Sequence, residues 1–163
     1  MRTLAAVLLL AVAVMCPGVA LADPTTVAVT GDVGRPAALT LDALRAYPSH
    51  TQAVAFESSA GPQAHTFDGA LLFDVVTAAE PAVDPTRHSP LVAFTILAIG
   101  ADDYRAAVAW AEIAPDFAGT QVLVAHTEDG KPLDRPRLVV PGDVKGGRYV
   151  SGLTELRVID TSR

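Results

Sequence analysis

The chain has 163 residues, of which 50% are hydrophobic and 18% are charged, and its formal net charge is −6. This composition supplies enough apolar side chains for one buried core and excludes a disordered or low-complexity chain. The negative charge disfavours nucleic acid and anionic membrane surfaces as partners.

The first 22 residues are predicted to be a secretory signal peptide. Arg2 gives a positive start, residues 4–15 are apolar but too short to span a bilayer, and Ala20-Leu21-Ala22 offers a cleavage site. Cleavage there leaves one mature domain, residues 23–163, which we expect to be exported to the periplasm or the medium. The alternative is a lipoprotein acylated at Cys16, the only cysteine of the sequence.

Apolar alternation and β-branched runs predict short strands along the rest of the chain, at residues 25–30, 51–57, 65–67, 91–99, 104–110, 121–127, 138–140 and 153–159. Helices are predicted at residues 39–44 and 71–79, with one further turn in 111–117. The strands come in hairpins and the helices are too few for a doubly wound sheet. We therefore predict an α+β fold, a single mixed and mostly antiparallel sheet domain with two or three short helices.

Local signals refine these boundaries. Thr40 is placed to cap the first helix, and Pro48 ends it. Asp68-Gly69 is predicted to turn the chain into the second helix, and Asp129-Gly130 to form a tight hairpin turn.

The segment from Pro141 to Val150, "PGDVKGGRYV", carries three glycines and two cations between two apolar runs. Gly146 and Gly147 can adopt positive φ and expose backbone N–H groups to an anion, while Lys145 and Arg148 add positive charge. Arg148 could bind a phosphate through two hydrogen bonds. The alternative is a bulged turn whose cations face solvent. The segment does not match a Walker loop.

Other candidate chemistry is weaker. The histidines are dispersed and lack metal-binding spacing, so no metal site is predicted; they are His50, His65, His88 and His126. Ser58 and Ser59 follow a strand in a short polar loop, but no nucleophile-elbow motif surrounds them. A serine hydrolase is therefore a minor alternative.

Four segments resemble one known family, the oxidoreductase molybdopterin-binding domain of sulfite-oxidase-like enzymes. They are "GDVGRPAALTLDALRAYP", "HTFDGALLFDVV", "AIGADDYRAAVAWAEI" and "DGKPLDRPRLVVPGDVKGGRYVSGLTELRVID". The last block is the most specific, and together they cover almost all of residues 23–163.

The resemblance implies a mixed α+β domain that cradles a pyranopterin molybdenum cofactor, whose phosphate is gripped by basic and backbone groups. It implies that Lys145, Gly146, Gly147 and Arg148 are the cofactor-binding residues, so molybdopterin becomes the expected cofactor. The resemblance therefore favours the anion-binding interpretation of the glycine loop.

Three departures from the family bear on catalysis. The cysteine that gives its thiolate to molybdenum is replaced by Ser58 here, with Glu57 and Ser59 as near alternatives for that position. The sequence is shorter than the family's enzymes, and we expect it to lack their dimerisation domain. Arg2 is followed by Thr3 rather than a second arginine, which is typical of a route that exports unfolded chains without a preloaded cofactor.

Two functions remain open from the sequence. The first is an exported protein that binds a pterin cofactor or another anionic ligand; as an enzyme it would carry out two-electron oxo transfer with Ser58 as a substitute metal ligand. The second is a non-catalytic binding or accessory module that reuses the fold. The expected partner is a small anionic ligand, with no nucleic acid and no membrane span.

Overall fold

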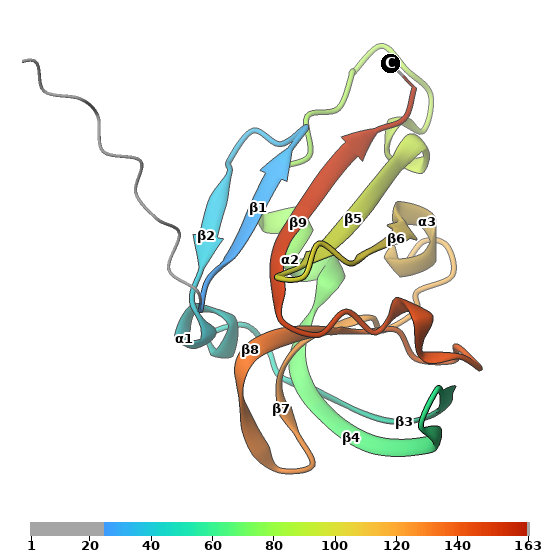
Figure 1. The fold of residues 1–163 in the computed structure, drawn as a ribbon. Helices are drawn as coiled ribbons and strands as arrows, with labels where there is room; N and C mark the ends of the chain where they lie inside the picture. Colours follow the sequence, from blue (N-terminus) through green and yellow to red (C-terminus); the bar gives the residue numbers. More distant parts are fainter. Residues whose placement is uncertain (1–24, 163) are drawn as a thin grey trace, which may run out of the picture.

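A computed structural model describes residues 25–162, which contain nine strands and three α-helices (Figure 1). The strands are β1 (Val27–Gly31), β2 (Ala37–Leu39), β3 (His50–Ser58), β4 (Gly61–Leu71), β5 (Phe94–Gly100), β6 (Arg105–Ala109), β7 (Leu123–Glu128), β8 (Lys131–Val139) and β9 (Leu153–Asp160). The α-helices are α1 (Leu41–Arg45), α2 (Leu72–Ala78) and α3 (Trp110–Ile113), and two 3₁₀ turns are η1 (Pro90–Ala93) and η2 (Gly146–Arg148). The predicted signal peptide lies outside the described residues.

The strands form two sheets. A five-stranded sheet has the order β2-β1-β9-β5-β6, and a four-stranded sheet has the order β3-β4-β7-β8. The pairing of β1 with β9 is parallel, and the other pairings of the described strands are antiparallel. The predicted α+β class with mixed, mostly antiparallel pairing is confirmed, but the strands are divided between two sheets instead of one.

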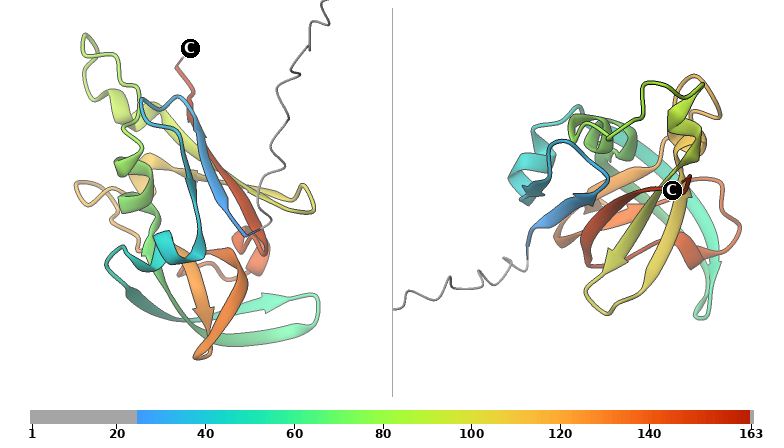
Figure 2. Two further views of the ribbon diagram at one scale, coloured as in Figure 1. Left: turned by 90° about the vertical axis from the view of Figure 1, so that its left-hand side faces the viewer. Right: turned by 90° about the horizontal axis from the view of Figure 1, so that it is seen from above.

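Two apolar cores hold the sheets and helices together. The larger core joins the two sheets to the helices, and Ile96 of β5, Val75 of α2 and Val124 of β7 are almost fully buried in it. The views in Figure 2 show α2 lying against this sheet. The smaller core lies on the four-stranded sheet and contains Phe67 and Leu123.

The helix predictions largely hold. The Ala43 N–H donates to Thr40 Oγ1 over 3.1 Å, so Thr40 caps α1 as expected. The predicted apolar face of the second helix is the buried face of α2. The third helix is a single turn that begins at Trp110 and ends before Pro115.

At three strands the structure differs from the sequence predictions. Asp68-Gly69 does not turn the chain; β4 runs through it with a bulge against β7, and a Cβ on Gly69 would lie 2.5 Å from the Val124 carbonyl oxygen. β8 begins at Lys131 despite Pro132 and Pro136, because β8 is an edge strand where a missing N–H is tolerated. The short strand β2 was not predicted.

Gly31 fixes the parallel pairing of the two ends of the described chain. It has φ of +89°, and a Cβ there would lie 2.1 Å from the Val158 carbonyl oxygen of β9. Gly130, in the β7–β8 turn, also has positive φ, at +74°, but a Cβ there would meet nothing within 4 Å. A side chain at Gly130 would therefore meet backbone strain alone, whereas a side chain at Gly31 would meet both strain and a steric clash.

We expect Gly31→Ala to lower the free energy of unfolding by about 3 kcal/mol or more, because it adds overpacking to strain. Gly130→Ala should cost only about 1 kcal/mol, the strain alone. Urea unfolding followed by circular dichroism measures both. Equal losses in the two variants would contradict the close approach of β1 to β9.

Candidate functional site

A cavity of about 570 Å³ lies where the end of β3 meets the segment from Pro141 to Val150. Its lining residues come from three separate parts of the chain: Phe56, Glu57, Ser58, Ser59, Arg137, Lys145, Gly146, Gly147 and Tyr149. The structure therefore brings the predicted residues Ser58, Lys145, Gly146 and Gly147 together. Glu57 and Ser59, the alternatives to Ser58, line the same cavity.

Backbone contacts hold the glycine loop against β3. The Glu57 N–H donates to the Val144 carbonyl over 2.8 Å, and Glu57 also forms a parallel bridge with Lys145. A Cβ on Gly146 would lie 2.7 Å from the Phe56 ring, so a glycine allows the loop to approach this closely. Tyr104, in the β5–β6 turn, donates a hydrogen bond from its hydroxyl to the Gly147 carbonyl, over 2.6 Å.

Two aromatic rings form an apolar wall of the cavity. Phe56 and Tyr149 stack with their ring centroids 4.3 Å apart. Tyr149 is buried, and its hydroxyl has no hydrogen-bond partner. Burial and the nearby Asp143 raise the pKa of Tyr149, against the opposing effect of Arg137. The hydroxyl is therefore a neutral group without a partner beside the cavity.

Arg137 is the charged lining residue that the sequence analysis missed, as it missed the two aromatic residues. Its Nη1 donates to both oxygens of Glu128, at 3.0 and 3.1 Å, and its guanidinium lies 5.6 Å from the centre of the Phe67 ring. Its Nε is buried and has no hydrogen-bond partner. The signal available in the sequence was its position directly before the apolar run that leads into the glycine loop. Arg137 adds a second cation, beside Lys145, to the cavity wall.

Arg148 stands apart from the cavity lining. Its Nε and Nη2 donate to Asp143 at 2.8 and 2.7 Å, and its Nη1 donates to both oxygens of Glu112, at 2.9 and 3.1 Å. The bond to Asp143 outweighs burial and, with the bond to Glu112, raises the pKa of Arg148. Glu112 also caps α3, since it accepts from the Ala109 N–H. In this arrangement Arg148 fastens the glycine loop to α3, and its contact with a cofactor stays a prediction.

Ser58 has a local role in the β3–β4 turn. Its hydroxyl donates to the Gly61 carbonyl over 3.0 Å and accepts from the Ala60 N–H over 3.1 Å. Neither Ser58 nor Ser59 shares the cavity lining with a histidine that could act as a base. This geometry gives no support to a serine hydrolase.

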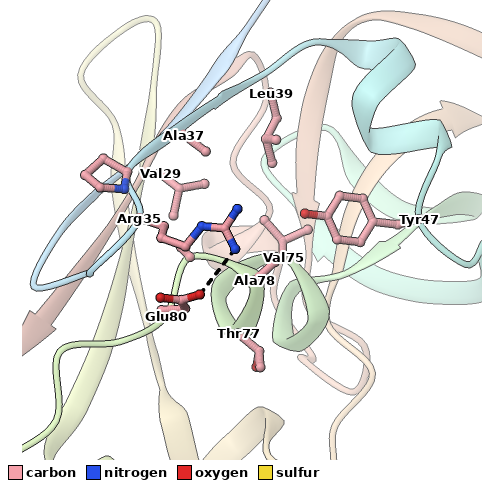
Figure 3. Close-up of a pocket in the computed structure, with 11 residues that line it drawn as sticks. Val29, Arg35, Ala37, Leu39, Tyr47, Val75, Thr77, Ala78 and Glu80 are labelled. Atoms are coloured by element: carbon pink, nitrogen blue, oxygen red, sulfur yellow. Dashed lines mark hydrogen bonds and ion pairs between the residues drawn. The ribbon is translucent and has the colours of Figure 1, made fainter.

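A second cavity, of about 390 Å³, lies between β2 and α2 and contains none of the predicted site residues (Figure 3). Arg35 and Tyr47 point into it from opposite walls. Arg35 pairs with Glu80 over 3.2 Å at its exposed rim. This cavity is separate from the one that holds the glycine loop.

No helix among residues 25–162 is long and apolar enough to cross a membrane.

Comparison with protein families identifies the domain. The family model described as the oxidoreductase molybdopterin binding domain matches residues 15–163. The chain belongs to this family. Among curated proteins, none matches the sequence significantly.

A solved structure supports the same fold for this molybdopterin-binding domain. It is the sulfane dehydrogenase SoxCD from Paracoccus pantotrophus, with a TM-score of 0.67 and 18% sequence identity. The match covers 85% of this chain but 39% of the SoxCD chain, so the domain spans well under half of that protein. At this identity the similarity establishes the fold and leaves the activity to the residues of the site.

The ion pairs of Arg148 with Asp143 and Glu112 form a clamp between the glycine loop and α3, and replacing Arg148 tests it. We expect Arg148→Ala to lower the free energy of unfolding by about 1–2 kcal/mol, because two carboxylates lose a charged partner that is itself two-thirds buried. Arg35→Ala is the matched control, since its ion pair is largely exposed and should contribute almost nothing. Urea unfolding of both variants measures the difference, and equal stabilities would contradict the clamp.

His126, on β7, makes stability depend on pH. It is buried, with Thr127 as its hydrogen-bond partner, and burial followed by the Arg45 charge lowers its pKa. The histidine then binds a proton more readily in the unfolded chain than in the folded one. The contribution of neutral His126 to stability is therefore complete above about pH 6.5 and declines as the pH falls below that value. We expect His126→Gln to lose less stability than wild type between pH 7 and pH 5. His88→Gln, in an exposed loop, should follow wild type.

Proposed function

We propose that this domain is an exported binding module that holds an anionic ligand in the cavity beside the glycine loop. The phosphate-bearing pterin of molybdopterin is the ligand that the family implies. We further propose that the domain does not carry out the thiolate-ligated molybdenum chemistry of the family's enzymes.

The observation that carries the proposal is the pairing of two cations with unpartnered polar atoms at one cavity wall. Lys145 and Arg137 both line the cavity, and the buried Arg137 Nε and Tyr149 hydroxyl lack partners among the described residues. A buried polar atom without a partner costs about 1–3 kcal/mol, which a bound ligand or water could recover. Both atoms are hydrogen-bond donors, which suits an anionic oxygen.

The cavity has matching features for a phosphate and a planar ring. Lys145 acts as a point charge, and Arg137 is oriented by Glu128. The close fit of Gly146 against Phe56 brings the loop backbone to the cavity wall. The Phe56–Tyr149 pair supplies an apolar surface for a ring.

The donor set does not fit thiolate ligation of molybdenum. The only cysteine of the sequence is Cys16, which precedes the described residues, and the resemblance places Ser58 where the family has its thiolate. The Ser58 hydroxyl is engaged within its own turn. A hard oxygen ligand would also set a different redox potential from a thiolate. We therefore derive no redox step for this cavity.

The first experiment measures molybdenum and pterin. The full-length chain is expressed in a host that makes molybdenum cofactor and is purified from the exported fraction. Mass spectrometry quantifies molybdenum, and fluorescence quantifies oxidised pterin. We expect far less than one molybdenum per chain; one molybdenum per chain would overturn the exclusion of molybdenum chemistry and make Ser58 the first ligand to mutate.

The anion site is tested separately with inorganic pyrophosphate as the probe. We expect Lys145→Ala and Arg137→Ala each to weaken pyrophosphate binding at least fivefold in calorimetry, because each removes a cation from the cavity wall. Arg135→Ala is the matched control, two residues from Arg137 on β8 but outside the lining. Equal affinity in wild type and Lys145→Ala would contradict the proposed anion site, whatever the metal content.

A further inference from the structure

Three potential metal ligands meet on the four-stranded sheet; none of them lines the proposed anion cavity, although Glu128 binds Arg137, which does. His65 lies on β4, Glu128 ends β7, and Asp129 occupies the β7–β8 turn. One donor atom from each lies within 4.8 Å of the other two. His65 Nδ1 is 2.8 Å from Asp129 Oδ2 and 3.3 Å from Glu128 Oε1. His65 is more than sixty positions from the adjacent Glu128 and Asp129, so spacing alone could not reveal the group.

We propose that His65, Glu128 and Asp129 form a binding site for a divalent transition-metal ion of the Zn²⁺ type. One imidazole nitrogen and two carboxylates are ligands that Zn²⁺ accepts, whereas Mg²⁺ and Ca²⁺ prefer oxygen alone. Zinc–ligand bonds of about 2.0–2.2 Å place donor atoms around one ion roughly 3–3.5 Å apart. The two separations from His65 Nδ1 differ from this range by a few tenths of an ångström at most, and the third, between the two carboxylates, is no more than 4.8 Å.

Contacts from outside the group orient each ligand. The Thr66 N–H donates to Asp129 Oδ1 over 2.8 Å, and Arg137 Nη1 donates to Glu128. The Thr66 bond, then the contact with His65, lowers the pKa of Asp129 and keeps it ionised. The remaining ring nitrogen of His65 lies 3.4 Å from Gln63 Oε1, which can accept its proton when Nδ1 binds a metal. Partners of this kind are characteristic of protein metal sites, where they fix the tautomer and direction of each ligand.

The site is open to solvent. A cavity of about 340 Å³ adjoins it, lined by His65, Thr66 and Asp129 together with short side chains. Asp129 keeps 51% of its side chain exposed, so an ion can enter without an opening motion. The cavity also leaves room for water in the remaining coordination positions, as three-ligand zinc sites require.

The charges around the three ligands determine how tightly the site is expected to bind a metal ion. Arg137 binds Glu128, and Lys131 lies near enough to Asp129 to lower its pKa. These two cations oppose part of the attraction of the two carboxylates for a divalent ion. We therefore expect a dissociation constant in the micromolar range, weaker than that of a closed structural zinc site.

Calorimetry of the untagged protein with ZnCl₂ tests the site. We expect one Zn²⁺ per chain, with binding at least tenfold weaker in His65→Ala and in Asp129→Asn. His88→Ala is the matched control, because His88 lies in an exposed loop outside the group, and its affinity should equal that of wild type. A hundredfold excess of Mg²⁺ should not displace the zinc.

Cobalt gives a second readout that does not depend on heats of binding. Co²⁺ at the same site should give a visible absorption band that is lost in His65→Ala, while circular dichroism shows that the variant remains folded. Unchanged zinc affinity in His65→Ala, or no zinc binding by wild type at millimolar concentration, would overturn the proposal. The three side chains would then be an ion-paired cluster that only joins β4 to the β7–β8 hairpin.

Discussion

The close contact between the glycine loop and the end of β3 is the constraint on which the candidate site depends. Gly146 lies against the Phe56 ring at a distance that excludes a Cβ, and the Glu57 N–H binds the loop carbonyl at Val144. This contact is what places Lys145 and Ser58 in the wall of the same cavity. The ion pairs of Arg148 hold the same loop from its other side. The cations of the loop thus divide between one that faces the cavity and one that holds the loop in place.

The sequence predicted the parts of the fold that depend on local chemistry. The Thr40 cap, the apolar face of α2 and the Asp129-Gly130 turn all follow from side chains close together in sequence, and each is present. The errors arise where tertiary packing determines the local structure. Gly69 looks like a turn residue, but it serves as the point where β7 packs against β4 without a Cβ. The two prolines of β8 look like strand breakers, but they lie on an edge.

The site was predictable as a segment but not residue by residue. Composition marked the glycine loop as a place for an anion, and the family resemblance pointed to Ser58 at the end of β3. Neither the composition nor the resemblance showed which arginine lines the cavity. Glu112, far upstream on α3, engages Arg148, whereas Glu128 holds Arg137 at the cavity wall. Such pairings between distant residues leave no local pattern, and the meeting of His65 with Glu128 and Asp129 escaped prediction for the same reason.

The order of strands in the five-stranded sheet has a consequence for how the chain folds. β9, the last strand, lies at the centre of this sheet, between β1 and β5. Until residue 160 is available, the sheet consists of two separate hairpins, β1–β2 and β5–β6, that have no strand between them. The contacts of β9 with β1 join residues from opposite ends of the described chain, a long-range closure that is slow compared with forming the hairpins. The larger sheet can therefore be completed only after β9 has been synthesised, and until then the edges of β1 and β5 that β9 covers have no strand beside them.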